Sequence, residues 1–307
     1  MSQVPELSPA VGDALRAGRP VVALESTIIS HGLPRPGNLA AARSFEDLLT
    51  GAGVTPATIA VIDGVPRAGL SAAELERIAL DDSVIKVSSR DLPLAMAAGR
   101  TAGTTVAATS VLAARAGIRV FATGGLGGVH RGHAESLDES ADLTVLARTP
   151  VTVVSAGVKS ILDIPATLER LETLGIAVVG YRTGRFPAFY LTDSGQPLDW
   201  RIDSPEQAAA VMAARDQLGE TSALLVANPL PEAAQLDPAV HDQVLSEALK
   251  AADEAGVRGK AVTPFLLAHM QQATAGASVA VNLEVARGNI ALAALIATAW
   301  SARAGQP

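Results

Sequence analysis

The stretches V-F-A-T-G-G-L-G-G-V-H-R-G, residues 120–132, and V-T-V-V-S-A-G-V-K-S, residues 151–160, decide the fold. Each begins as a short apolar run and ends in glycine and other small residues, which is typical of a buried strand that opens into a loop. Between them lies D-E-S-A-D, residues 138–142. Two aspartates, two histidines and a lysine therefore gather in an otherwise apolar region, and we expect the chemistry here.

The rest of the chain repeats this pattern. Apolar runs such as P-V-V-A-L-E-S-T (20–27), I-A-V-V-G-Y (176–181) and A-L-L-V-A-N-P (223–229) alternate with helical segments. Such alternation indicates βαβ units and a parallel sheet covered by helices on both faces. We therefore predict an α/β protein with a three-layer α/β/α architecture and a mostly parallel central sheet, built as one domain over residues 1–307.

Local signals add detail. The run T-I-A-V-I-D-G-V-P-R-A-G-L (58–70) predicts two strands joined at D-G, and Ser71 with Glu74 forms a capping box that starts a helix. The Pro and Gly residues of T-I-I-S-H-G-L-P-R-P-G-N (27–38) predict an irregular loop. The segment 183–203 is rich in Pro, Gly and polar residues, which favours an excursion or lid.

Composition limits the function classes. Hydrophobic residues make up 49% of the 307 residues but aromatic residues only 3%, so the core must consist of Ala, Val, Leu and Ile. The net charge of -7 argues against broad nucleic-acid binding, although it allows a local cationic pocket for one phosphate. The absence of cysteine excludes disulfides, thiolate nucleophiles and Cys-ligated zinc.

Targeting signals are weak. The N-terminal residues lack the basic start and apolar run of a signal peptide. The apolar stretch Ile290–Trp300 is too short to span a bilayer and is better interpreted as a buried helix. We therefore predict a cytoplasmic protein that has no membrane partner.

The glycine run G-G-L-G-G, residues 124–128, is the obvious candidate for phosphate binding, because glycines after a strand expose backbone N–H groups. It completes neither the dinucleotide fingerprint nor the P-loop pattern, so NAD and ATP sites are weakly supported. A tight turn that merely needs glycine explains the run equally well.

Asp138 and Asp142 are four residues apart, so a helical turn would place both on one face. Carboxylates with few nitrogen ligands suit Mg²⁺ or Mn²⁺ held partly by water, and His130 and His133 could supplement them. A solvated, capped acidic turn is an equally good alternative. The sequence contains no zinc-hydrolase H-E-x-x-H pattern and no convincing Ser/His/Asp order.

Three further charged residues follow apolar runs. Glu25 closes the run Val21–Leu24, where a carboxylate is costly to bury unless it is paired or protonated; a strand end that reaches solvent is the alternative. Lys86 lies in a β-branched run and could simply face solvent. Lys159 follows a strand and small residues, so it could act as an amine nucleophile that forms a Schiff base, or it could be a solvated lysine at a helix start.

Several motifs together resemble one family, pseudouridine-5′-phosphate glycosidase, which also includes proteins encoded in indigoidine biosynthesis clusters. The motifs are A-L-E-S-T-I-I-S-H-G, K-V-S-S-R-D-L-P, F-A-T-G-G-L-G-G-V-H-R-G, S-A-D-L, S-A-G-V-K-S-I-L-D and T-P-F-L-L-A. The resemblance extends from about Pro20 to Ala302, with the motifs in the family's order.

The resemblance implies reversible cleavage of the C-glycosidic bond of pseudouridine 5′-phosphate to uracil and ribose 5-phosphate, as a carbon–oxygen lyase in pseudouridine catabolism. It implies Mn²⁺ or another divalent ion, a homotrimer, and a cytoplasmic location. By position, Glu25 matches the proton donor, Lys159 the covalent nucleophile, Lys86 a substrate-binding lysine and Asp138 the metal ligand. The other substrate-contact positions are Val106, Ser140, Ala141, Asp142, His130 and Asn282.

Two other functions stay open. One is a family member that acts on a different C- or N-glycosyl phosphate, and the other is a non-catalytic sugar-phosphate sensor. The presence of Glu25, Lys86, Asp138 and Lys159 together argues against the sensor, because binding alone needs neither an acid nor an amine.

Overall fold

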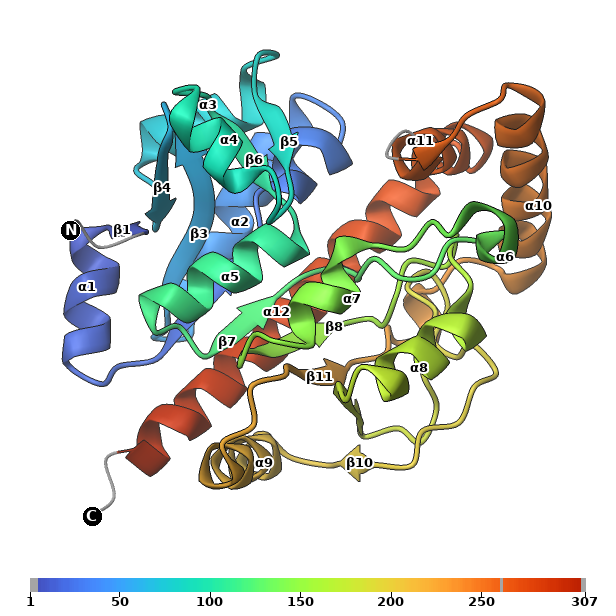
Figure 1. Ribbon diagram of the computed structural model, residues 1–307. Helices are drawn as coiled ribbons and strands as arrows, with labels where there is room; N and C mark the ends of the chain where they lie inside the picture. The colour runs from blue at the N-terminus through green and yellow to red at the C-terminus, as the bar shows by residue number, and fades with distance from the viewer. Residues whose placement is uncertain (1–4, 260–261, 305–307) are drawn as a thin grey trace.

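A sheet of eleven strands runs through the computed structural model, which describes residues 5–259 and 262–304 (Figure 1). The strands are β1 (Glu6–Leu7), β2 (Val21–Leu24), β3 (Thr55–Ile62), β4 (Val65–Ala68), β5 (Ile85–Val87), β6 (Ala102–Thr104), β7 (Val120–Ala122), β8 (Thr152–Ser155), β9 (Ala177–Tyr181), β10 (Arg201–Ile202) and β11 (Leu224–Ala227). Their main order is β1-β4-β3-β2-β7-β8-β11-β9-β10. Among the described strands, β3 pairs antiparallel with β4 and β6, and the other pairs are parallel.

Helices cover both faces of this sheet. The α-helices are α1 (Pro9–Arg16), α2 (Gly37–Gly51), α3 (Ala72–Leu80), α4 (Leu92–Ala97), α5 (Val106–Ala116), α6 (His133–Ser136), α7 (Ala141–Leu146), α8 (Ile164–Thr173), α9 (Pro205–Leu218), α10 (Pro238–Glu254), α11 (Val262–Ala273) and α12 (Ala277–Ala304). Two short turns complete the set, the π-helical η1 (Ile28–Gly32) and the 3₁₀ η2 (Glu232–Ala234). The predicted α/β class with a mostly parallel sheet is confirmed, whereas the single domain stays a prediction.

The side chains of one strand divide between two cores. In β2, Val21 and Ala23 pack with residues of α1, α5, α7 and α8, whereas Val22 and Leu24 pack with α2, α9 and α12. Figure 1 shows α5 and α7 on one side of the central strands, with α12 running along the other. Because successive strand residues point to opposite faces, a continuous apolar run such as this one belongs to a strand buried on both sides.

Helix α12 contains the predicted buried segment Ile290–Trp300. By length and composition its stretch Ala277–Arg303 is long and apolar enough to cross a membrane. Its apolar residues Ile290, Ala293 and Ile296 are nevertheless buried in the core that it forms with α2 and α9. The prediction of a buried helix is therefore confirmed, but the helix is longer than the predicted segment, and the prediction that it is too short to span a bilayer is wrong.

Two local predictions are confirmed. The D-G turn joins β3 to β4, with φ angles of 48° at Asp63 and 82° at Gly64. A Cβ on Gly64 would lie 2.6 Å from the Met96 carbonyl oxygen, so both backbone angle and space require glycine there. At the start of α3, Ser71 and Glu74 form the reciprocal capping box.

Two other predictions hold only in part. The expected loop over 27–38 contains the π-helical turn η1, which packs Ile29 and Ser30 inward. The segment 183–203 is not a lid, because Phe186 and Tyr190 within it are buried in the first core. The Pro and Gly content marked irregular backbone correctly, but irregular backbone can still be packed.

Candidate active site

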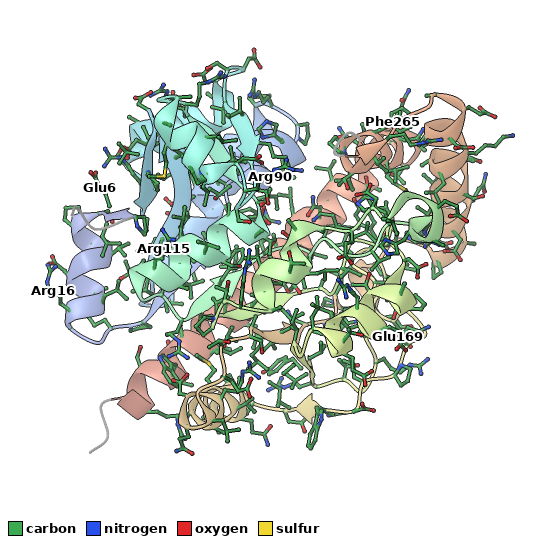
Figure 2. All side chains as sticks on the ribbon, viewed as in Figure 1. Glu6, Arg16, Arg90, Arg115, Glu169 and Phe265 are labelled. Atoms are coloured by element: carbon green, nitrogen blue, oxygen red, sulfur yellow. The ribbon has the colours of Figure 1, made fainter. Side chains whose placement is uncertain are left out.

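A cavity of about 400 Å³ lies at the carboxyl ends of β2, β7 and β8. Strands β2 and β7 are neighbours in the sheet. The strand that follows β2 in the chain, β3, lies towards one edge of the sheet, whereas the strand that follows β7, β8, lies towards the other edge. Such a reversal of strand order is where parallel sheets bind their ligands. Figure 2 shows Arg90, which lines the cavity, near the middle of the molecule and Phe265 of α11 at the upper right. Thr263 and Leu267 of α11 line the cavity.

The sequence-predicted site residues all line this cavity. They are Glu25, Lys86, Val106, His130, Asp138, Ser140, Ala141, Asp142, Lys159 and Asn282. The structure therefore brings together residues that come from six separate segments of the chain, while their individual roles stay predictions.

Glu25 follows β2 directly and is half-buried. The hydroxyl of Thr123, just after β7, donates a hydrogen bond to Glu25 Oε1. Although the residue is partly open to the cavity, burial of its carboxyl group raises its pKa above the ordinary value; Asp142 acts in the same direction, whereas Lys159, Thr123 and Lys86 lower it. A raised pKa favours the protonated carboxyl group, which is the form that can donate a proton.

Buried hydroxyl groups fix the backbone beside Glu25. Ser26 Oγ donates to the Ile59 carbonyl oxygen at 2.6 Å and accepts from the Thr104 N–H at 2.9 Å. Thr104 Oγ1 donates to the same Ile59 oxygen at 2.7 Å. The ends of β2 and β6 are thereby tied to the middle of β3 next to Glu25 in the chain.

Lys159 is half-buried on the turn after β8, and its Nζ donates to the Gly125 carbonyl oxygen at 2.7 Å. The two strand exits also bond to each other, because the Leu126 N–H donates to the Gly157 oxygen at 2.9 Å and the Lys159 N–H donates to the Leu126 oxygen at 3.1 Å. Gly157 has φ of 74°, and a Cβ there would lie 2.4 Å from the Pro187 oxygen. The lysine is therefore carried by a constrained turn.

The glycine run is mainly a packing feature. A Cβ on Gly127 would lie 2.2 Å from Ser140 Oγ, and the Gly127 N–H already donates to Asp142 Oδ2 at 2.8 Å. The Leu126 N–H is engaged as well, with Gly157. These contacts favour the tight-turn interpretation over a phosphate-binding nest.

The prediction that Asp138 and Asp142 share one helical face is wrong. Ser140 caps α7, which begins only at Ala141, and Glu139 pairs with Val129 as an isolated antiparallel bridge, so the chain is extended before the helix. Asp142 is buried and its Oδ1 accepts from the Ala107 N–H at 2.9 Å. With Oδ2 bound to the glycine run, Asp142 holds the loop and the N-terminus of α5 together.

Asp138 is half-buried and lines the cavity near His130. Burial lowers the pKa of His130, whereas Asp138 raises it and Lys159 lowers it. His133, the second candidate nitrogen ligand, lies instead with Nδ1 at 3.2 Å from the Asp138 carbonyl oxygen. Within residues 5–259 and 262–304, no group of three or more His, Cys, Asp or Glu side chains could hold a metal ion.

Lys86 extends from β5 into the cavity. The side chain is exposed to the open cavity. Partial burial of its amine nevertheless lowers the pKa of Lys86 below the ordinary value, and the positive charge of Lys159 lowers it further. Glu25 and Asp142 act in the opposite direction. Lys86 thus belongs to the charged cluster of the site, and its exposed position faces the cavity.

Sequence reasoning predicted Asn282 but missed Thr27, which also lines the cavity. In the described part of the chain, Thr27 Oγ1 and Asn282 Oδ1 are buried polar atoms of cavity-lining residues without a hydrogen-bond partner. Such orphan atoms indicate a site that binds a polar ligand or water. The position of Thr27 beside Glu25 was the signal that could have found it.

A hydrogen-bond chain begins at Ser160, next to Lys159; Ser160 and His241 are buried, whereas Asp242 is exposed. Ser160 Oγ and His241 Nε2 are 2.8 Å apart, and His241 Nδ1 lies 2.9 Å from Asp242 Oδ1. Ser160 and His241 are both buried and neither lines the cavity, so this Ser–His–Asp contact supports the turn that carries Lys159 and has no access to a substrate. The 81-residue separation of Ser160 and His241 left no local sequence signal.

Comparisons with known proteins show the family of the chain. The family described as Indigoidine synthase A like protein matches residues 10–299. The pseudouridine-5′-phosphate glycosidase of Frankia alni is 63% identical over 301 residues, which cover 98% of this chain and 83% of the relative. The enzyme of the same name from Salinispora tropica is 63% identical over 294 residues, which cover 95% and 91%.

Two solved structures are similar over nearly the whole chain. The prealnumycin C-glycosynthase AlnA, in complex with ribulose 5-phosphate, has a TM-score of 0.92 and 37% identity, and all of both chains is covered. An indigoidine synthase A-like protein from Thermotoga maritima has a TM-score of 0.88 and 36% identity over 96% of both chains. The chain therefore belongs to the indigoidine synthase A-like family, which its pseudouridine-5′-phosphate glycosidase relatives share.

Proposed function

We propose that this chain is an enzyme that reversibly cleaves the carbon–carbon glycosidic bond of pseudouridine 5′-phosphate, with water, to uracil and ribose 5-phosphate. The observation that carries the proposal is the meeting of Glu25, whose pKa is raised by burial, with the amine of Lys159 in one cavity. The 63% identity to relatives named pseudouridine-5′-phosphate glycosidase supports this substrate.

The chemistry explains why an acid and an amine are needed together. Two-carboxylate glycosidases protonate a leaving oxygen, but here C1′ is bonded to C5 of uracil, which has no lone pair to protonate. Lys159 Nζ attacks C1′ as the C1′–O4′ bond breaks, and Glu25 donates its proton to O4′. The new secondary ammonium then returns a proton to Glu25, which leaves a ring-opened amine adduct.

The adduct then releases uracil by proton transfer. Glu25 donates the recovered proton to uracil C5; the nitrogen lone pair of Lys159 forms a C1′=N bond, and the electron pair of the breaking C1′–C5 bond re-forms the C5=C6 double bond of uracil. Water then adds to this imine and frees ribose 5-phosphate and the amine. Covalent catalysis by lysine is effective because it divides one difficult cleavage into easier steps.

Lys86 is proposed to bind the substrate as a cation, with the 5′-phosphate as its partner. Lys86 and Arg90 line the same cavity, and Lys86 is exposed within it. A charge-assisted contact of this kind is stronger than a neutral hydrogen bond. The remaining assigned contacts are part of the same proposal and come from Val106, His130, Ser140, Ala141, Asp142 and Asn282.

The cavity residues fit a divalent ion such as Mn²⁺ that has few protein ligands. Asp138 offers a single carboxylate at the cavity, and no cluster of three or more candidate ligands exists in the described residues, so the ion would keep most of its waters. Hard divalent ions bind in this manner, and one bound here would neutralise negative charge on the substrate. A homotrimer in the cytoplasm completes the proposal and is supported by the sequence resemblance.

The test is incubation with pseudouridine 5′-phosphate in Mn²⁺ or in EDTA, with uracil release followed and borohydride added to trap an imine. We expect metal-dependent uracil release and a reduced pentose-phosphate adduct on the Lys159 peptide. The likeness to AlnA, a C-glycosynthase, supports a second candidate, C-glycoside synthesis with a partner other than uracil. The adduct formed from ribose 5-phosphate without uracil release from pseudouridine 5′-phosphate would favour that second candidate.

A further inference from the structure

Two side-chain amides, one buried and one half-buried, lie beside the start of the glycine run. Asn289, on α12, is almost fully buried, and its Nδ2 donates to the Thr123 carbonyl oxygen at 2.7 Å and to the Gly124 carbonyl oxygen at 3.1 Å. Asn228 follows β11, and its Nδ2 donates to Asn289 Oδ1 at 3.0 Å. The three contacts join α12 and β11 to the exit of β7.

Asn289 helps to fix the main chain of Thr123, the residue whose hydroxyl group donates to Glu25. The Thr123 N–H donates to the Val154 oxygen at 3.0 Å, and Asn289 binds the carbonyl group of the same residue. With both main-chain groups held, a β-branched side chain has little freedom at χ1. The Thr123 hydroxyl is therefore directed at Glu25 Oε1, to which it donates.

The hydrogen bond from Thr123 determines which oxygen of Glu25 carries the acidic proton. Because Oε1 accepts from Thr123, the proton of a neutral Glu25 carboxyl group is favoured on Oε2. Within residues 5–259 and 262–304, no hydrogen bond engages Oε2, and Glu25 lines the cavity. The proton is thus left on the oxygen that can donate it to a substrate.

We propose that Asn289, supported by Asn228, is a positioning residue for the acid: it orients Thr123 so that Glu25 carries its transferable proton on Oε2. The inference rests on the proposed function, in which Glu25 is the proton donor. It adds three residues, Thr123, Asn228 and Asn289, that touch the reaction only through Glu25.

The charged groups around Glu25 shift its pKa, and substitutions of Thr123, Asn228 or Asn289 do not remove them. Lys159 and Lys86 favour the carboxylate, and Asp142 and burial favour the neutral acid. The hydrogen bond from Thr123 also favours the carboxylate, so its loss raises the pKa of Glu25. An acid must be protonated to act, so activity falls as pH rises through that pKa, and loss of the bond moves this alkaline fall to higher pH.

The first variant is Thr123→Val, which keeps the shape and removes the donor. We expect kcat for uracil release to fall roughly ten- to a hundredfold, because the acid is no longer oriented, and the alkaline limb of kcat to move to higher pH. Thr123→Ser restores the hydroxyl and should return both readouts towards wild type. If Thr123→Val changes neither kcat nor the alkaline limb of its pH profile, the proposal is overturned.

The second variant, Asn289→Leu, tests the relay behind Thr123. The matched control is Asn38→Leu, since Asn38 is also fully buried and donates to two carbonyl oxygens, of Ile29 at 2.6 Å and Ala79 at 2.7 Å. Both variants should lower Tm, but only Asn289→Leu should move the alkaline limb. If Asn289→Leu does not fold, the milder Asn228→Ala carries the same expectation. Equal loss of Tm with an unmoved limb would make Asn289 merely structural and overturn the proposal.

Glu25→Gln separates this inference from the function beneath it. If wild type releases uracil and Glu25→Gln does not, the proposed function stands and the variants of Thr123 and Asn289 decide the relay. If Glu25→Gln has the kcat of wild type, the acid role itself is wrong and the inference falls with it.

Discussion

Two walls of the cavity differ in how firmly the fold holds them. Glu25, Thr123 and Lys159 follow strands β2, β7 and β8, whose residues are all buried. The opposite wall comes from α11, which has only Leu266 and Met270 buried among its twelve residues. Reacting groups must be held to within about 0.5 Å of a productive geometry, and the strand ends provide that rigidity.

The two walls of the cavity therefore have different roles. Elements with few buried apolar contacts open at low cost in free energy, as a wall that admits a substrate must do. We therefore expect substitutions on the strand wall to change kcat, and substitutions on α11 to change KM alone. The predictions below test that division in order of decreasing effect.

Lys159→Ala should have the largest effect, because it removes the atom that bonds to C1′. We expect uracil release to fall by at least about 10⁴-fold, as covalent catalysis is lost, and borohydride trapping to disappear. Lys250→Ala, at an exposed lysine of α10, is the control and should retain both. Substantial turnover by Lys159→Ala at unchanged Tm would rule out the imine route.

Lys86→Gln should have an intermediate effect on binding. Loss of one charge-assisted contact of about 1.5–3 kcal/mol predicts a KM higher by roughly ten- to a hundredfold. Lys86→Arg should recover part of the loss, because the charge remains. An unchanged KM for pseudouridine 5′-phosphate in Lys86→Gln would remove Lys86 from phosphate binding.

The sequence predicted the fold well wherever the signal is local. The apolar run of β2, the turn at Asp63 and the Ser71 capping box each depend on neighbouring residues, and each is confirmed. Local patterns failed where packing decides the outcome, as for Phe186 and Tyr190 in the segment expected to be a lid. Buried aromatic residues in an irregular segment reveal their partners only in three dimensions.

The site shows the same limit. The predicted residues came largely from the resemblance, and the structure places them around one cavity. The residues behind them were missed because their partners are remote, with Asn289 166 residues from Thr123 and His241 81 from Ser160. Conversely, the spacing of Asp138 and Asp142 suggested one helical face, but the Ser140 cap starts the helix between them.

The smallest predicted effect concerns Leu267, which lines the cavity from α11 and is half-buried. Leu267→Ala removes apolar contact of about 1–2 kcal/mol with a bound substrate, which predicts a KM higher by roughly fivefold to thirtyfold at unchanged kcat. Leu295→Ala, at an exposed leucine of α12, is the control and should leave both constants unchanged. A fall in kcat at unchanged KM for Leu267→Ala would show that α11 helps to hold the reacting geometry, and the proposed division between the two walls would then be wrong.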